Sequence, residues 1–157
     1  MPEFTNKEIK EVLLPTLEVL ARLRLPYKGA LQMRVITLEL RGHMAMVEDL
    51  REVSLKSFAK LDDNGEIRTR KDKNDRPTNV VIFKDEDEEK LAPTNDTTQA
   101  AQDFATFSRE LFGNTYECKE TLTLDHLQDE ACPWNSPAEL LINLGNLLVI
   151  PEQGDSE

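Results

Sequence analysis

The sequence predicts an α+β protein: an N-terminal antiparallel helical hairpin with one long helix, packed on a small antiparallel sheet and two shorter helices. Two observations carry this prediction. The run from Lys28 to Leu61 has apolar residues at helical spacing and contains no proline, which indicates a helix about 50 Å long. Further along the chain, residues 115–124 alternate between polar and apolar side chains, as a half-buried strand does.

The first helix of the hairpin is predicted to begin at Thr5-Asn6-Lys7-Glu8, a pattern in which the threonine and the glutamate cap each other's backbone amides. Pro15 removes a backbone donor inside the segment, so we expect a kink or a late start. The segment closes at Leu25-Pro26, because the residue before a proline avoids helical angles. The helix is expected to have one apolar stripe, because the following residues are three or four positions apart and share one face: Ile9, Val12, Leu13, Thr16, Leu17 and Leu20.

The long helix carries two apolar stripes, which is more than a surface helix usually has. The first contains Leu31, Val35, Leu38, Gly42, Ala45 and Val53, and the second contains Ile36, Leu40, His43, Met44, Val47, Leu50, Phe58 and Leu61. Packing against the first helix can bury only one of them, so the other must meet the C-terminal part of the chain or a second copy. At Gly42 we expect a close approach of another backbone, since glycine otherwise costs a helix about 1 kcal/mol.

The rest of the chain is predicted to hold short strands and two short helices. Residues 62–96 are charged and turn-forming, with strands near Glu66–Arg70 and Asn79–Phe83 and an exposed acidic run at 85–89. A third helix ends at Gly113-Asn114, and a final helix begins at Ser136-Pro137-Ala138-Glu139. We interpret residues 1–157 as a single domain: a hairpin at 6–61, a charged region at 62–96 and a helix–strand–helix region at 97–152.

Charge limits the classes of partner. The net charge is −11, with 30 acidic and 19 basic residues, and an acidic field repels nucleic-acid phosphates. The local basic cluster of Arg68, Arg70, Lys71, Lys73 and Arg76 is interleaved with acidic residues and favours a solvated loop. No stretch has the length of a membrane span and no leader pattern is present. We therefore expect no nucleic-acid or membrane partner, and a soluble cytoplasmic protein.

No pattern in the sequence predicts a catalytic residue, a metal ligand set or a cofactor. Asp62-Asp63-Asn64-Gly65 lacks the spacing of a calcium loop and favours a turn. Cys118 and Cys132 form no CxxC motif and are expected as reduced thiols. His43 is expected at the rim of the long helix, and His126 in a cap or turn rather than as a catalytic base. Trp134, the single tryptophan, is expected as a lid on the core, with an exposed binding anchor as the alternative.

Read in order, the chain resembles a family of short uncharacterised tailed-phage proteins over about residues 9–152. The motifs of this resemblance are the segments Leu23-Arg24-Leu25-Pro26-Tyr27-Lys28, Lys60-Leu61-Asp62-Asp63-Asn64-Gly65-Glu66, Asp103–Leu111, Leu122-Thr123-Leu124-Asp125-His126-Leu127 and Ser136-Pro137-Ala138-Glu139-Leu140-Leu141. The family has no assigned catalytic residues. The resemblance implies a phage or prophage protein, either a minor virion or tail-assembly component or an accessory protein acting on the host. It would then be located in the cytoplasm of the host cell or associated with a virion.

The leading hypothesis is a non-enzymatic protein–protein interaction or assembly protein of phage origin, which self-associates or docks through the second stripe of the long helix. The expected contact row is Leu40, Met44, Val47 and Arg51. Two alternatives remain open. One is an accessory inhibitor of a host defence protein that uses the acidic residues 97–157 against a basic groove, and the other is a small acidic metal-dependent hydrolase.

Overall fold

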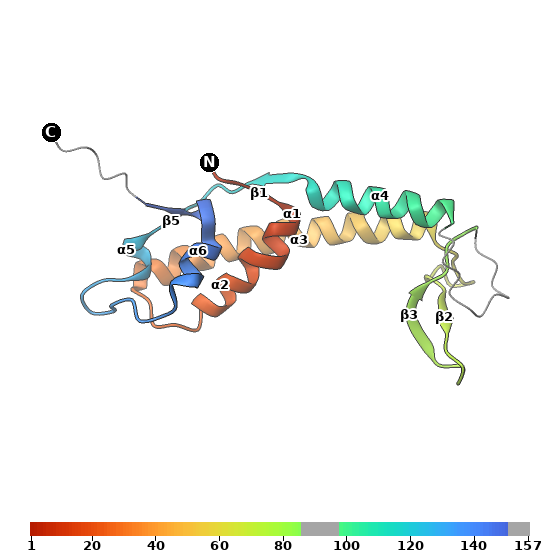
Figure 1. The fold of residues 1–157 in the computed structure, drawn as a ribbon, viewed down its shortest axis with the longest axis horizontal. Helices are drawn as coiled ribbons and strands as arrows, with labels where there is room; N and C mark the ends of the chain where they lie inside the picture. The colour runs from red at the N-terminus through yellow and green to blue at the C-terminus, as the bar shows by residue number, and fades with distance from the viewer. Residues whose placement is uncertain (86–97, 151–157) are drawn as a thin grey trace. The chain divides into compact units, whose positions relative to one another are not determined.

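The computed structural model describes residues 1–85 and 98–150 of the chain and has the predicted α+β class. The sequence was interpreted as one domain, and the chain divides into two compact units. The first unit contains residues 1–46 and 112–157, and the second contains residues 47–111. Figure 1 shows the helices and strands of both units.

The first unit begins with a helix of three parts: α1 (Asn6–Glu8), a single π-helical segment η1 (Ile9–Leu13) and α2 (Leu14–Leu20). The predicted capping box is confirmed, because the Glu8 amide donates to the Thr5 hydroxyl at 3.1 Å and the Thr5 amide donates to Glu8 Oε2 at 2.8 Å. Pro15 lies in the first turn of α2, directly after the π-helical segment. A π bulge is one of the adjustments by which a helix continues past an interrupted hydrogen-bond ladder.

The long helix α3 (Tyr27–Phe58) runs through Gly42 without a break. In the first unit, α2 and α3 form the predicted hairpin (Figure 1), and Arg41 of α3 reaches Glu18 of α2 at 3.4 Å. Side chains from both helices are fully buried, and they share the core with residues from the C-terminal part of the chain. The largest of these buried residues are Ile9, Leu13, Leu17, Leu20, Ile36, Leu40, Leu122, Leu127, Leu144 and Leu147.

The strands of the first unit form two separate pairs. β1 (Glu3–Thr5) is antiparallel to β4 (Thr115–Glu117), whereas β5 (Leu122–Thr123) is parallel to β6 (Leu148–Val149). The single strand expected at 115–124 is therefore wrong, because the chain leaves the first pair after Glu117 and the amide of Lys119 donates to Glu39 at 2.9 Å. The described part of the unit also contains two short helices, α5 (Leu124–Leu127) and α6 (Ala138–Leu144), and the 3₁₀ turn η2 (Gly145–Leu147).

The second unit contains the last part of α3, the hairpin of β2 (Thr69–Lys71) and β3 (Pro77–Val81), and most of α4 (Gln99–Gly113). Both strands were predicted within three residues of their position, and α4 ends at the predicted glycine. The predicted turn at 62–65 is confirmed: Asp62 Oδ1 accepts from the amides of Asn64 and Glu66, each at 2.9 Å, and Gly65 has φ +80°.

The small core of the second unit is aromatic. Phe104 of α4 is buried and lies 6.4 Å from Phe58 and 6.1 Å from Phe83, measured between ring centroids. Asp85 accepts from the amide of Ala100 at 2.9 Å, and this backbone hydrogen bond lowers the pKa of Asp85. The rest of the predicted acidic run, residues 86–89, lies outside the described residues.

Candidate functional site: the faces of helix α3

The contact row expected from the sequence lies in the interior. Leu40, Met44 and Val47 have exposed fractions of only 0%, 6% and 2%. Their prediction as a docking face is therefore corrected: this is the stripe of α3 that the chain itself covers. The physical reason is that a long helix must bury one apolar stripe in its own core, and the sequence does not say which of two similar stripes is used.

Arg51, the fourth residue of the predicted row, is half-buried. Its guanidinium carbon lies 5.5 Å from the centre of the Phe104 ring. At this distance the cation is attracted by the negative face of the ring. Arg51 therefore contributes to the packing of the second unit through its contact with Phe104.

The other stripe of α3 faces solvent. In the first unit, Leu31, Val35, Leu38 and Met46 are 50%, 48%, 56% and 55% exposed. Gly42 lies on the same stripe, and a Cβ built on it would have no atom of the described residues within 4 Å apart from the local backbone of α3 itself. Among residues 1–85 and 98–150, therefore, no other backbone makes the close approach expected at Gly42. We call Leu31, Val35, Leu38, Gly42 and Met46 the outward stripe.

A polar cluster between the outward stripe and the buried stripe of α3 holds the helix to β4. Glu39 Oε1 accepts hydrogen bonds from the Tyr116 hydroxyl and from the Lys119 amide, each at 2.9 Å, and Glu39 Oε2 lies 3.8 Å from Cys118 Sγ. His43 stacks on Tyr116 with ring centroids 3.9 Å apart. These contacts hold β4 against the middle of α3.

The ionisation of this cluster suits a structural role. Burial and the Glu39 carboxylate raise the pKa of Tyr116 to about 12, and burial raises the pKa of the Cys118 thiol. Burial lowers the pKa of His43, whose Nε2 lies 2.6 Å from Asn6 Oδ1. Because nucleophilic cysteines need a depressed pKa, the arrangement does not activate Cys118.

His126 makes a cap, as the sequence favoured. The Thr123 amide donates to His126 Nδ1 at 3.0 Å at the start of α5. Within residues 1–85 and 98–150, no three His, Cys, Asp or Glu side chains are grouped so that they could hold a metal ion. In the same residues, no helix combines the length and apolar character needed to cross a bilayer.

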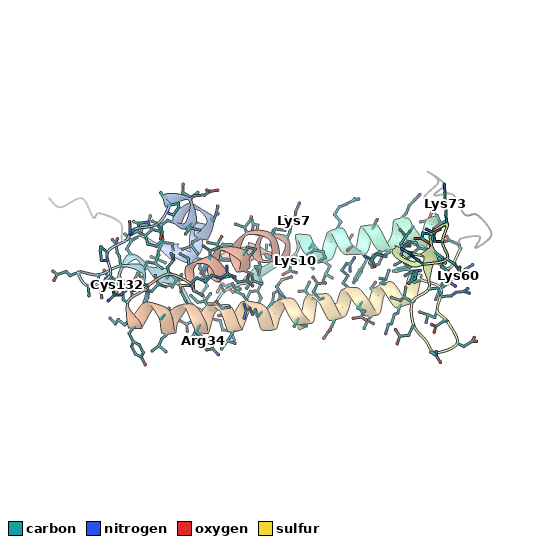
Figure 2. All side chains as sticks on the ribbon, turned by 90° about the horizontal axis from the view of Figure 1, so that it is seen from below. Lys7, Lys10, Arg34, Lys60, Lys73 and Cys132 are labelled. Carbon is teal, nitrogen blue, oxygen red and sulfur yellow. The ribbon has the colours of Figure 1, made fainter. Side chains whose placement is uncertain are left out.

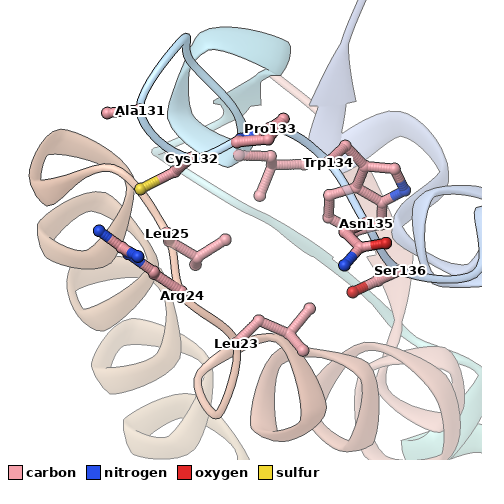
Figure 3. Close-up of a pocket in the computed structure, with 10 residues that line it drawn as sticks. Leu23, Arg24, Leu25, Ala131, Cys132, Pro133, Trp134, Asn135 and Ser136 are labelled. Carbon is pink, nitrogen blue, oxygen red and sulfur yellow. The ribbon is translucent and has the colours of Figure 1, made fainter.

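Two depressions in the first unit meet at the segment that joins α2 to α3. One lies between α2 and α3 and has a volume of about 290 Å³. The other has a volume of about 510 Å³ and is lined by the loop Ala131–Ser136, including the half-exposed Trp134. Figure 3 shows Arg24 and Cys132 on one side of this depression and Trp134, Asn135 and Ser136 on the other. Leu23 and Leu25 line both depressions.

Sequence reasoning missed this pair of depressions. Trp134 was singled out, with a binding anchor as the minority interpretation, but nothing in the spacing of the chain placed residues 131–136 next to residues 23–25. The one sequence feature that pointed to a binding surface here is the segment Leu23-Arg24-Leu25, in which apolar and cationic residues alternate at a predicted helix end.

Comparison with known proteins gives no relative: no protein-family model, curated protein or solved structure matches the chain.

Proposed function

We propose that the chain is a non-enzymatic protein–protein interaction module that self-associates through the outward stripe of α3. The single observation that carries the proposal is the exposure of Leu31, Val35, Leu38 and Met46, each about half exposed, along one face of one helix. Contiguous exposed apolar surface of this kind commonly marks an interface.

Gly42 supports a second helix as the occupant. A helix interior loses about 1 kcal/mol when alanine is replaced by glycine. Outside the local backbone of α3, no atom of the described residues lies within 4 Å of the position that a Gly42 side chain would take. A second α3 crossing at this point would use the space, because small residues let helix backbones approach closely.

A two-fold arrangement fits the spacing of the stripe. Leu38 and Met46 each lie four positions from Gly42. If two copies of α3 cross antiparallel at Gly42, Leu38 of one copy lies beside Met46 of the other, and the contact repeats by symmetry. Such a self-complementary interface is the usual form of a homodimer.

The test is the mass in solution, measured by light scattering during size-exclusion chromatography. We expect a concentration-dependent dimer for the wild type, and a monomer for the double variant Leu31→Asp/Val35→Asp. Val19→Asp, on an exposed apolar residue of α2, is the matched control and should remain a dimer. A wild-type protein that is monomeric at every concentration would overturn the proposal.

The phage origin implied by the resemblance is part of this proposal. A self-associating module of this size would serve as a minor virion or tail-assembly component, or as an accessory protein in the host cell. Detecting the chain by mass spectrometry in purified particles, or only in lysate, would separate these two roles.

A further inference from the structure

We propose that the first unit has a second binding surface, where α2 joins α3, that accepts an acidic amphipathic segment of a partner protein. The surface consists of the two depressions that share Leu23 and Leu25 and of the arginines at their edges. This proposal goes beyond self-association, and the surface has only Leu38 in common with the outward stripe.

The shape of the surface fits a peptide segment better than a single small molecule. Two depressions of about 290 Å³ and about 510 Å³ adjoin along the same pair of leucines. Each has room for a large apolar side chain, and their floors include the buried Leu17 and Met33 on one side and Leu127 on the other. A segment lying across Leu23 and Leu25 can place one apolar side chain in each depression.

The charges at the edges select the partner. Arg24 lines the larger depression and Arg34 the smaller one, and both are exposed; Arg34 projects from α3 in Figure 2. Neither guanidinium has an ion-pair or hydrogen-bond partner among the described residues. Arg41, at the edge of the smaller depression, is already engaged by Glu18 at 3.4 Å.

These two cations stand out because the chain as a whole carries a net charge of −11. The net charge of the chain repels an acidic partner, whereas Arg24 and Arg34 attract it at the edges of the two apolar depressions, so charge complementarity favours binding at this surface. Guanidinium groups bind carboxylates in bidentate geometry. The segment that fits therefore has two apolar side chains flanked by Asp or Glu. A nucleic acid would meet the same arginines, but it has nothing to fill the apolar depressions.

The experiment uses the full chain and a display library of random linear peptides. The library is selected on the wild type and, separately, on Arg24→Glu/Arg34→Glu. We expect wild-type selection to enrich peptides that combine net negative charge with at least two large apolar residues, and the double variant to lose them. Enrichment of neutral or basic peptides, or no enrichment, would overturn the proposal.

Trp134 supplies the affinity measurement, because it is the only tryptophan and lines the larger depression. Binding of an enriched peptide that itself lacks tryptophan should change the fluorescence emission of Trp134. The dissociation constant should rise about tenfold or more in the double variant, because two exposed ion pairs are replaced by two repulsions. Lys7→Glu/Lys119→Glu makes the same charge change at exposed residues of the first unit that line neither depression, and it should bind like the wild type.

Two further arms make the outcome specific. Replacing the acidic residues of the peptide by their amides should weaken binding as the double variant does, and equal binding would contradict the role of charge. Leu31→Gln/Val35→Gln makes the same stripe polar without adding charge beside Arg34, so it should lose self-association and still bind the peptide unchanged. Failure of peptide binding in a wild type that still dimerises would reject this surface alone. A single-stranded oligonucleotide that competes for Trp134 would assign the surface to nucleic acid instead.

Discussion

The backbone of Gly29, in the first turn of α3, lies directly against the carbonyl group of His126 in α5. A Cβ built on Gly29 would overlap that carbonyl oxygen. The glycine thus allows the start of the long helix to pack on the C-terminal part of the first unit. The backbone around His126 is held by the turn of α5, in which the Gln128 amide donates to the Leu124 carbonyl at 3.0 Å, so the His126 carbonyl cannot easily move away.

Gly29→Ala should therefore destabilise the first unit. The added methyl group must displace a backbone carbonyl, and overpacking of this kind costs about 1–3 kcal/mol or more. Chemical denaturation followed by circular dichroism measures the change in the free energy of unfolding. An unchanged midpoint would mean that α5 is not packed on α3 as described.

Gly42→Ala is predicted to have the opposite effect on the same helix. The position is exposed and open, so alanine should stabilise the monomer by about 0.5–1 kcal/mol through helix propensity alone. Denaturation at a concentration too low for dimers isolates this effect. If two copies of α3 cross at Gly42 as proposed, the larger side chain of Gly42→Leu should weaken self-association. A dimer that forms equally well with leucine at this position would show that the two helices do not cross there.

Glu39 is predicted to be a stabilising residue because it accepts hydrogen bonds from both the Tyr116 hydroxyl and the Lys119 amide. Glu39→Ala removes both hydrogen bonds, and because water can still reach the donors, each loss should cost about 0.5–1.5 kcal/mol. Glu39→Gln keeps one carbonyl acceptor and should cost less. The order wild type, glutamine, alanine in denaturation midpoint is the expected result, and equal midpoints would show that the cluster contributes nothing.

His43 predicts a pH dependence of stability. Burial lowers its pKa in the folded state from the ordinary value of 6.5, so the unfolded chain takes up a proton at a higher pH than the folded chain does. The stability contribution is present above the unfolded pKa and is lost as the pH falls from about 7 through the folded pKa. Denaturation at several pH values should show this loss in the wild type and a smaller one in His43→Gln. Parallel pH profiles would exclude His43 as the cause.

The sequence predicted the elements that local chemistry determines. The capping box at Thr5 and Glu8, the turn at Asp62 and the end of α4 at Gly113 were all found where the pattern placed them. Each depends on hydrogen bonds or backbone angles within a few residues. These interactions are the same whatever the rest of the chain does.

Long-range pairing could not be predicted in this way. The break between β4 and β5 depends on Glu39, about eighty positions away, accepting from the Lys119 amide. The pairing of β5 with β6 joins residues 122 and 148. The local sequence gives no indication that Lys119 meets Glu39 or that β5 pairs with β6. An alternating run such as 115–124 has the same pattern whether it forms one strand or is divided between two strand pairs.

The choice between the two stripes of α3 gives the sharpest test of the fold. Leu40 is fully buried and Leu38, two positions away, is 56% exposed. Leu40→Ala should cost about 2–5 kcal/mol, because it removes buried methyl groups and leaves a cavity, whereas Leu38→Ala should change the free energy of unfolding by less than about 0.5 kcal/mol. Both variants replace leucine by alanine in the same helix, so the change in helix propensity is the same in each. The difference between their free energies of unfolding therefore measures the burial of the side chain alone. Denaturation of the two variants, at a concentration where the protein is monomeric, distinguishes the two arrangements. Equal losses of stability, or a larger loss for Leu38→Ala, would mean that the stripe with Leu40 is the exposed one, as first expected from the sequence.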